Sequence, residues 1–245
     1  MQTIKNKKEE INYNKDQSLD SITEYIERCF KIYPFESYYS HIHSYLNRPN
    51  MNILEMGCGN GFLSFWLEKK TKRTIYGTDI SKEFVNTAHV YGNAHGYQSQ
   101  FILMDIENSG LKPYSFDLII MLDALHHFPD TGYVLKEIYR SLKNNGVFII
   151  FEPNPFNPWI MYNRIRRKID KEEWGFEHEK MFSKRHYINS FKSMGFDIVE
   201  SKTIRYIPKR TIDERKYLFQ FDGLLSKIPI INSFGFATFI CARKR

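Results

Sequence analysis

Short apolar runs alternate with amphipathic stretches along residues 50–153, and this alternation constrains the fold more than any other feature of the sequence. The apolar runs are typical of buried strands, and the stretches between them place apolar residues three and four apart, as helices do. Strands that alternate with helices connect by right-handed crossovers and build a mostly parallel sheet with helices on both faces. The expected strands are 51–56, 74–77, 100–104, 116–122 and 147–151, and the expected helices are 61–67, 81–91 and 133–142, the last ended by a cap at 144–146.

Three glycines follow the first apolar run, in the pattern Gly57-x-Gly59-x-Gly61. Glycine adopts positive φ without a Cβ clash and lets a ligand approach the backbone closely. A loop of this kind after the first strand is the expected place for a nucleotide-type ligand. The dinucleotide fingerprint would require glycine at position 62, which is Phe62, so an NAD-dependent oxidoreductase is disfavoured. The carboxylate of Glu55, just ahead of the loop, suits a cationic aminoacyl ligand better than a pyrophosphate.

Acidic residues also stand at the ends of the next strands. Asp79 lies where a carboxylate is expected to bind ribose hydroxyls, although it could serve only as a helix cap, a role for which Ser81 competes. Asp105 closes the third strand and is either a ligand contact or a turn residue. Asp117 opens the fourth strand and is interpreted as a strand-start acid rather than a ligand.

Taken together, these residues resemble the class I S-adenosylmethionine-dependent methyltransferases. The resemblance covers residues 50–153 and includes the stretches Leu125-His-His-Phe128 and Glu152-Pro-Asn-Pro155, which are most similar to small-molecule members such as the quinone-biosynthesis methyltransferases. It implies a Rossmann-like α/β fold with a seven-stranded, mostly parallel sheet, helices on both faces, and an antiparallel last strand at 235–242 beside the fifth.

The resemblance also implies a role for each matching position, with S-adenosylmethionine as the cofactor. Glu55 and the loop from Gly57 through Cys58 and Gly59 to Gly61 would hold the methionine part, with no chemistry assigned to the Cys58 thiol. Asp79 would bind the ribose. The remaining contacts would come from Asp105 at the adenine amino group, Ile80 and Ile106 on the ring, and the Leu122 carbonyl at the methionine amine.

Two histidines, His126 and His127, follow the fourth strand and are the candidate catalytic residues. Methyl transfer from a sulfonium mainly requires alignment of the acceptor, exclusion of water and, for a hydroxyl acceptor, removal of a proton. Histidine is the usual general base near neutral pH. We expect the two rings to point in different directions, so that at most one meets the acceptor. The alternative is that both are packing residues, and Glu152 either lines the pocket or is structural.

The class of methyl acceptor is predicted from two features: a motif that is absent after the fourth strand, and the charge and aromatic content of the C-terminal part. The fourth strand does not lead into a Pro-Pro-Tyr motif, which favours an oxygen or carbon acceptor. Residues 151–245 hold nineteen basic and eleven acidic residues, a net charge of +8, with many aromatic side chains. Such a mixture suits a small apolar or lipid-linked acceptor and peripheral membrane contact. The alternatives are a nucleic-acid (RNA) methyltransferase, disfavoured because no RNA-binding module is present, and a cofactor-binding protein without transferase activity.

The sequence favours a single methyltransferase domain over residues 18–245. Three scattered cysteines exclude a disulfide framework, and the His41-x-His43 pair is not interpreted as a metal site, so no metal is expected. The polar N-terminal residues lack the apolar core of a signal peptide, which favours a cytoplasmic location. The predicted parts are a mobile tail (1–17), a helical lid over the cofactor mouth (18–48), the cofactor-binding core (50–153) and substrate-side inserts (154–182 and 205–233).

Overall fold

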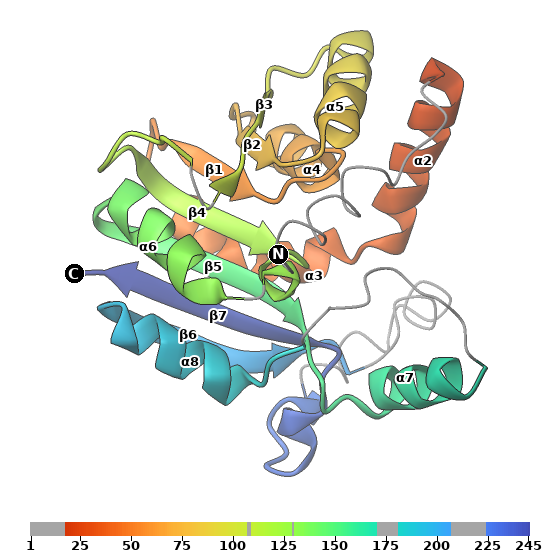
Figure 1. Ribbon diagram of the computed structural model, residues 1–245, viewed down its shortest axis with the longest axis vertical. Coiled ribbons are helices and arrows are strands. Elements are labelled where there is room, and N and C mark those ends of the chain that lie inside the picture. The colour runs from red at the N-terminus through yellow and green to blue at the C-terminus, as the bar shows by residue number, and fades with distance from the viewer. Residues whose placement is uncertain (1–17, 107–108, 129, 171–180, 207–223) are drawn as a thin grey trace.

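The computed structural model describes residues 18–106, 109–128, 130–170, 181–206 and 224–245, with a seven-stranded sheet at its centre (Figure 1). The strand order is β3-β2-β1-β4-β5-β7-β6, and β7 runs antiparallel to its neighbours β5 and β6. The expected architecture is thus confirmed, including the last strand beside the fifth. The strands are β1 Ile53–Met56, β2 Tyr76–Asp79, β3 Gln100–Leu103, β4 Phe116–Leu122, β5 Leu142–Pro153, β6 Phe196–Ile204 and β7 Ala237–Lys244.

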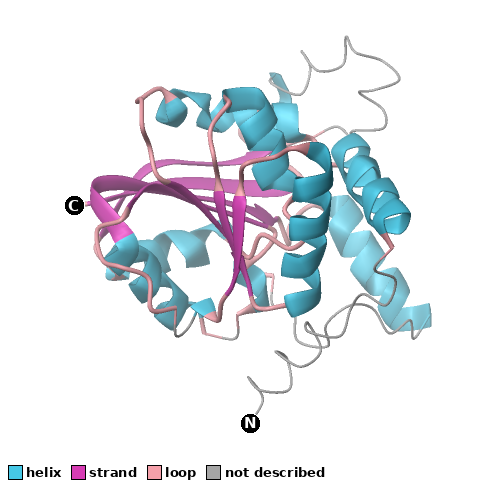
Figure 2. Cartoon of the chain, turned by 90° about the horizontal axis from the view of Figure 1, so that it is seen from above, coloured by secondary structure: helices cyan, strands magenta, loops and turns pink. Residues whose placement is uncertain are grey.

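Helices cover both faces of the sheet (Figure 2). Alternate residues along β4 and β5 point to opposite sides, so Leu118 and Ile149 pack with α3 and α4, whereas Ile119 and Ile150 pack with α6 and α8. The helices are α2 Leu19–Ile32, α3 Phe35–Ile42, α4 Phe62–Thr71, α5 Lys82–His95, α6 Thr131–Ser141, α7 Pro158–Asp170 and α8 Lys184–Ser193, with short 3₁₀ turns η1 His43–Leu46, η3 Leu125–His127 and η4 Ile231–Ser233.

A third apolar cluster attaches the N-terminal helix to the glycine loop. Ile22 and Ile26 of α2 pack with Cys58 of the loop and with Phe65 and Phe101. The cluster therefore fixes α2 beside the carboxyl end of β1. The predicted tail, 1–17, lies outside the described residues.

The end of α6 differs from the expectation. The helix stops at Ser141, and Leu142 is already extended and paired with Phe116 of β4. Asn145, at φ +61°, lies within β5, where the pairing register with β4 shifts. The residues 144–146 therefore form an irregularity inside the strand rather than a helix cap, because an asparagine in the left-handed region fits a bulge as well as a helix end.

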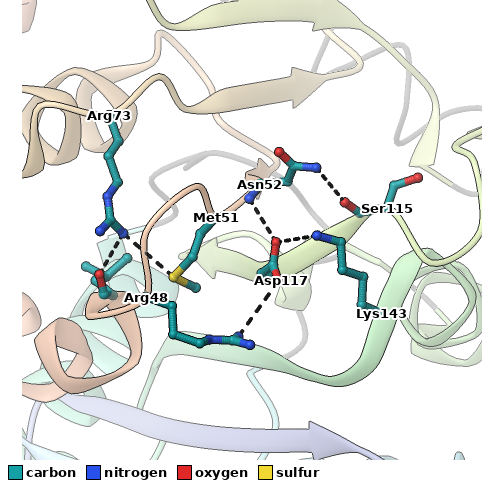
Figure 3. A network of polar contacts seen from close by, with 8 residues as sticks. Arg48, Met51, Asn52, Arg73, Ser115, Asp117 and Lys143 are labelled. Carbon is teal, nitrogen blue, oxygen red and sulfur yellow. Dashed lines mark hydrogen bonds and ion pairs between the residues drawn. The ribbon is translucent and has the colours of Figure 1, made fainter.

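An ion-pair network lies at the amino-terminal edge of the sheet (Figure 3). Asp117 accepts hydrogen bonds from Lys143 Nζ at 2.7 Å and from the Asn52 backbone at 3.0 Å, and Arg48 lies 3.9 Å away. Asp117 is thus a structural acid, far along β4 from the carboxyl edge. No helix within the described ranges is both long and apolar enough to cross a bilayer.

Candidate active site

The glycine loop turns sharply between β1 and α4. The backbone N–H groups of Gly57 and Cys58 both donate to the Thr78 carbonyl of β2, at 2.8 and 3.0 Å. Gly57, Gly59 and Gly61 all have positive φ, at +68°, +51° and +77°. Because L side chains rarely adopt this region, glycine is required at each of the three positions.

The surroundings of the three glycines differ. A Cβ on Gly57 would lie 2.7 Å from Ala124 Cβ, and one on Gly61 would lie 2.6 Å from the Phe101 ring, so both are packed against neighbours. A Cβ on Gly59 would meet nothing within 4 Å. The middle of the loop therefore borders open space, as a backbone that cradles a ligand should.

Asp79 at the end of β2 holds the loop in place. Its carboxylate accepts hydrogen bonds from the backbone N–H of Gly59 at 2.7 Å and of Ser81 at 2.9 Å. The helix cap belongs to Ser81, whose hydroxyl accepts from Phe84 N–H. Burial raises the pKa of Asp79 above its ordinary value. Each carboxylate oxygen has a second lone pair, so Asp79 can still accept a hydrogen bond from a ligand hydroxyl.

Glu55 lies one strand away and is buried without a cationic partner among the described residues. The Ser64 hydroxyl of α4 donates to its carboxylate at 2.5 Å. Burial raises the pKa of Glu55 to about 8. Beside it in the loop, Asn60 Oδ1 is buried and has no hydrogen-bond partner within the described ranges. Glu55 and Asn60 offer oxygen atoms that accept hydrogen bonds and attract cations. This fits the ammonium and the sulfonium of S-adenosylmethionine.

The other predicted cofactor residues lie at the same edge. Met104 N–H donates to the Asp79 carbonyl at 2.8 Å, which places Asp105 next to the end of β2. Ile80 is half-buried, whereas Ile106 packs into the apolar cluster with Met56. Leu122 is buried at the end of β4, and burial raises the pKa of Cys58 well above its ordinary value, so that its thiol stays protonated.

A buried carboxylate organises the turn that follows β4. Glu152 at the end of β5 is fully buried. Its Oε1 accepts from the backbone N–H of Ala124 at 3.1 Å and of Leu125 at 2.8 Å. Its Oε2 lies 2.6 Å from His126 Nδ1 and accepts from Tyr187 Oη at 3.4 Å. Because a carboxylate only accepts, His126 donates from Nδ1–H to Glu152.

The second histidine lies against the first. The ring centroids of His126 and His127 are 4.2 Å apart with an interplanar angle of 35°, so the rings pack together rather than point in different directions. The 3₁₀ turn brings them together, because His127 N–H bonds back to the Ala124 carbonyl. Burial and the neighbouring His126 lower the pKa of His127 to about 3, so His127 is neutral near pH 7.

The N-terminal helices reach the same edge through aromatic residues. Tyr33, between α2 and α3, packs on Phe62 directly after Gly61, with ring centroids 4.8 Å apart. Tyr38 of α3 is buried against Phe151, and its hydroxyl accepts a hydrogen bond from Arg205 at 2.7 Å. The segment predicted as a lid therefore contacts both the glycine loop and the end of β5.

The sequence did not point to two residues of this site, nor to one contact. Glu152 was named as a pocket or structural residue, but its contact with His126 was not visible in the sequence. Tyr187 comes from α8, and Asn60 is an ordinary loop residue by sequence; neither carried a signal. No cluster of three or more His, Cys, Asp or Glu side chains that could hold a metal is found in the described part of the chain.

Comparison with known proteins identifies the domain that these residues form. Residues 54–150 match the family model described as "Methyltransferase domain". A sterol 24-C-methyltransferase, ERG6B of Gibberella zeae, is 27% identical over 169 residues, which are 64% of this chain and 42% of that protein. The methyltransferase GfsG of Streptomyces halstedii is 30% identical over 97 residues, 38% of this chain and 34% of that protein. This chain thus spans about two fifths or less of these relatives.

Solved structures share the fold over most of the chain. A SAM-dependent methyltransferase from Thermotoga maritima has a TM-score of 0.63 at 20% identity, covering 93% of this chain and 97% of that one. The [4+2]-cyclase SpnF has a TM-score of 0.59 at 16% identity, covering 83% and 77%. The match over residues 54–150 shows a methyltransferase domain in this chain, and the seven-stranded sheet around it has the fold of S-adenosylmethionine-dependent methyltransferases.

Proposed function

We propose that this methyltransferase transfers the methyl group to an oxygen or carbon of a small, apolar or lipid-linked acceptor. The observation that carries the proposal is the buried Glu152 carboxylate at the end of β5, 2.6 Å from His126 Nδ1 in the turn after β4, the strand beside β1. The pair of Glu152 and His126 supplies a proton acceptor. The Pro-Pro-Tyr motif, which many amino-group methyltransferases carry after the fourth strand, is absent from this sequence. The name of the sterol 24-C-methyltransferase relatives supports a lipid acceptor and carbon as the acceptor atom.

The cofactor is proposed to bind along the carboxyl edge of β1, β2 and β3. Bound S-adenosylmethionine supplies a methyl group activated by the sulfonium charge. Glu55 and the loop Gly57–Gly61 would hold its cationic aminoacyl end, because the loop borders open space at Gly59 and carries unpaired acceptors. Asp79 would accept from the ribose hydroxyls. Asp105, Ile80 and Ile106 would contact the adenine, and the Leu122 carbonyl the methionine amine.

His126 is proposed as the general base. Glu152 fixes the Nδ1–H tautomer, so the lone pair on Nε2 can take a proton from an acceptor hydroxyl or an activated carbon. A positioned base contributes roughly 10²–10⁴-fold to the rate. His127, which burial keeps neutral, would pack against the His126 ring and limit its rotation. The alignment of acceptor and methyl group supplies a larger share, up to about 7–11 kcal/mol.

The N-terminal helices are proposed to act as the lid of the single domain 18–245. The ring contacts of Tyr33 with Phe62 and of Tyr38 with Phe151 support this role for the segment 18–48. A closed lid would exclude water from the reacting groups. Residues 171–180 and 207–223 lie outside the described residues. They are parts of the two predicted inserts and contain several of their aromatic residues.

A methyl-transfer screen tests the proposal. The full chain is incubated with donor labelled in the methyl group and, separately, with cellular lipids, a small-molecule extract and total RNA. Label in a lipid or small molecule, lost in His126→Ala while cofactor binding measured by calorimetry is retained, would support it. Label only in RNA would overturn the acceptor class. Cofactor binding with no label in any fraction would favour the alternative of a binding protein without transferase activity.

A further inference from the structure

Helix α7 has its apolar side turned away from the rest of the molecule. Trp159 and Ile165 are 59% and 58% exposed, and Met161 and Tyr162 are exposed as well. At 3.6 residues per turn these four side chains lie within one arc of roughly 160°. The half-buried residues of the helix, Ile160 and Asn163, fall on the opposite side. A helix that covers a protein core has the reverse arrangement.

Basic side chains flank this apolar arc. Arg164 and Arg166 are exposed and lie near its two margins. Residues 153–169 contain no acidic residue, and Asp170 ends the helix. Trp159 and Tyr162, whose ring centroids are 5.8 Å apart, add the amphipathic aromatic groups that favour a membrane–water boundary.

A second exposed apolar segment lies beside the start of α7. Leu224, Ile228, Ile230 and Phe234 are exposed, Ile230 at 78%, and the neighbouring exposed cation is Lys227. Together with Phe156, these two segments contribute nine of the fifteen exposed large hydrophobic side chains among the described residues. Exposed apolar side chains concentrated in one region mark an interaction surface, whereas scattered ones need no explanation.

Two buried asparagines join these segments into one surface. Asn157 Nδ2 donates to the Phe234 carbonyl at 2.7 Å, and its Oδ1 accepts from the backbone N–H groups that begin α7. Asn154 Nδ2 donates to the carbonyls of Ser233 and Gly235. These bonds fix the start of α7, at Pro158, six residues after Glu152, close to the carboxyl end of β5 (Figure 1).

We infer that this surface, α7 with residues 224–234, binds the headgroup region of an anionic lipid bilayer. The exposed arc would enter the boundary between headgroups and acyl chains, and Arg164, Arg166 and Lys227 would contact lipid phosphates. The carboxyl edge of β5 would then face the bilayer, so that an apolar acceptor could pass to His126 without crossing water. Only this last step rests on the proposed function; lipid binding does not.

Vesicle co-sedimentation of the full chain tests the inference. The probes are phosphatidylcholine vesicles and phosphatidylcholine vesicles that contain phosphatidylserine. We expect binding to the mixed vesicles, lowered about tenfold or more by W159S combined with I165S and about tenfold by R164E combined with R166E. Tyr133→Ser, which alters an equally exposed aromatic on α6, is the matched control and should bind as the natural chain does. Thermal unfolding followed by circular dichroism checks that each variant remains folded.

Several outcomes would overturn the inference. One is the absence of vesicle binding, and another is binding that the α7 variants leave unchanged. A third is self-association in sedimentation velocity that W159S with I165S abolishes, since the surface would then be a contact between copies. Calorimetry with S-adenosylmethionine and the transfer screen are independent of vesicle binding, so failure of the proposed function and failure of this surface are distinguishable.

Discussion

The two edges of the central sheet treat carboxyl groups in opposite ways. At the amino edge, Asp117 is paired with Lys143 and approached by Arg48. At the carboxyl edge, Glu55, Asp79 and Glu152 receive hydrogen bonds from a hydroxyl, backbone N–H groups and a histidine, and within the described ranges none contacts a lysine or arginine. The amino edge is neutralised by its own residues, whereas the carboxyl edge keeps acceptors that a cationic ligand can satisfy.

The pKa values of the two edges follow this difference. Burial raises the pKa of Glu55 to about 8 and also raises that of Asp79. Burial is also the largest single influence on Asp117, but the hydrogen bonds from Lys143 and Asn52 and the charges of Lys143 and Arg48 together outweigh it, and the pKa of Asp117 is lowered. The comparison teaches that the same residue type is paired within the fold at one edge and keeps acceptor capacity at the other, depending on whether a cation is supplied by the fold.

The largest effect is expected from Glu152→Gln. The amide can still accept from the Ala124 and Leu125 backbone, but its NH₂ would face His126 Nδ1 and force the proton to Nε2. The transfer rate should fall about 10²–10⁴-fold, the contribution of a general base. Asp117→Asn is the matched control at the other edge and should leave the rate unchanged.

The measurements that decide this prediction are single-turnover transfer, calorimetry and histidine NMR. Cofactor affinity should remain within about twofold of the natural chain because Glu152 contacts the turn and not the glycine loop. The NMR spectrum should report the tautomer change at His126. A loss of cofactor affinity with an unchanged rate would show that Glu152 belongs to the binding site instead.

The next largest effect is expected from Asp79→Ala, which should lower the affinity for the cofactor. The substitution removes charge-assisted hydrogen bonds of roughly 1.5–3 kcal/mol each, so affinity should fall about 10- to 150-fold. Asp79→Asn retains one acceptor for Gly59 N–H and should lose less. Calorimetry measures both, with Asp117→Ala as the control. Equal losses at the two edges would break the distinction between them.

Much of the carboxyl edge could be predicted because it is encoded locally. The glycine loop, Asp79 and Asp105 each follow an apolar run, and parallel strands bring such positions together. The Ser183 hydroxyl caps α8, and a serine ahead of a helix is likewise a local signal.

The remainder depends on pairing between distant segments. Glu152 meets His126 only because β5 lies beside β4, and Tyr187 joins them from α8. The irregularity at 144–146 looks like a helix end in the sequence, since Asn-Gly suits both, and strand pairing decides between them. The sequence favoured peripheral membrane contact for the basic, aromatic C-terminal part, but which side of α7 faces outward depends on how the helix packs.

Glu55 and Asp117 should give the two edges opposite pH dependences of stability. The folded pKa of Glu55 lies above its unfolded value, so the folded state binds more protons and stability falls as pH rises from about 4.5 to 8. The folded pKa of Asp117 is lowered, so its contribution is present above its unfolded pKa and is lost as the pH falls through the folded value. Urea unfolding from about pH 8 down to about pH 3 checks both slopes, which Glu55→Gln and Asp117→Asn should separately flatten.

The same shift predicts proton release when the cofactor binds. Near pH 7 Glu55 is mostly protonated, and a bound cation would favour its carboxylate, so close to one proton should leave per site. Calorimetry in two buffers of different ionisation enthalpy counts the protons, and Glu55→Gln should release none. A proton count near zero in the natural chain would mean that Glu55 is already ionised or does not sense the cation.

The smallest effect is expected from Lys143→Met, which breaks the main ion pair of the amino edge. Lys143 Nζ lies 2.7 Å from Asp117. The Lys143 side chain is 39% exposed, so its charge is already solvated in the folded chain and the pair adds little to stability. The Asn52 backbone and Arg48 would still contact Asp117. The free energy of unfolding should therefore fall by about 1 kcal/mol at most, and by less in high salt.

Glu152→Ala, which leaves two buried N–H groups without an acceptor, should lower the free energy of unfolding by more than about 2 kcal/mol. Urea unfolding of both variants compares the edges directly, and equal losses would mean that the exposed pair contributes as much to stability as the buried carboxylate.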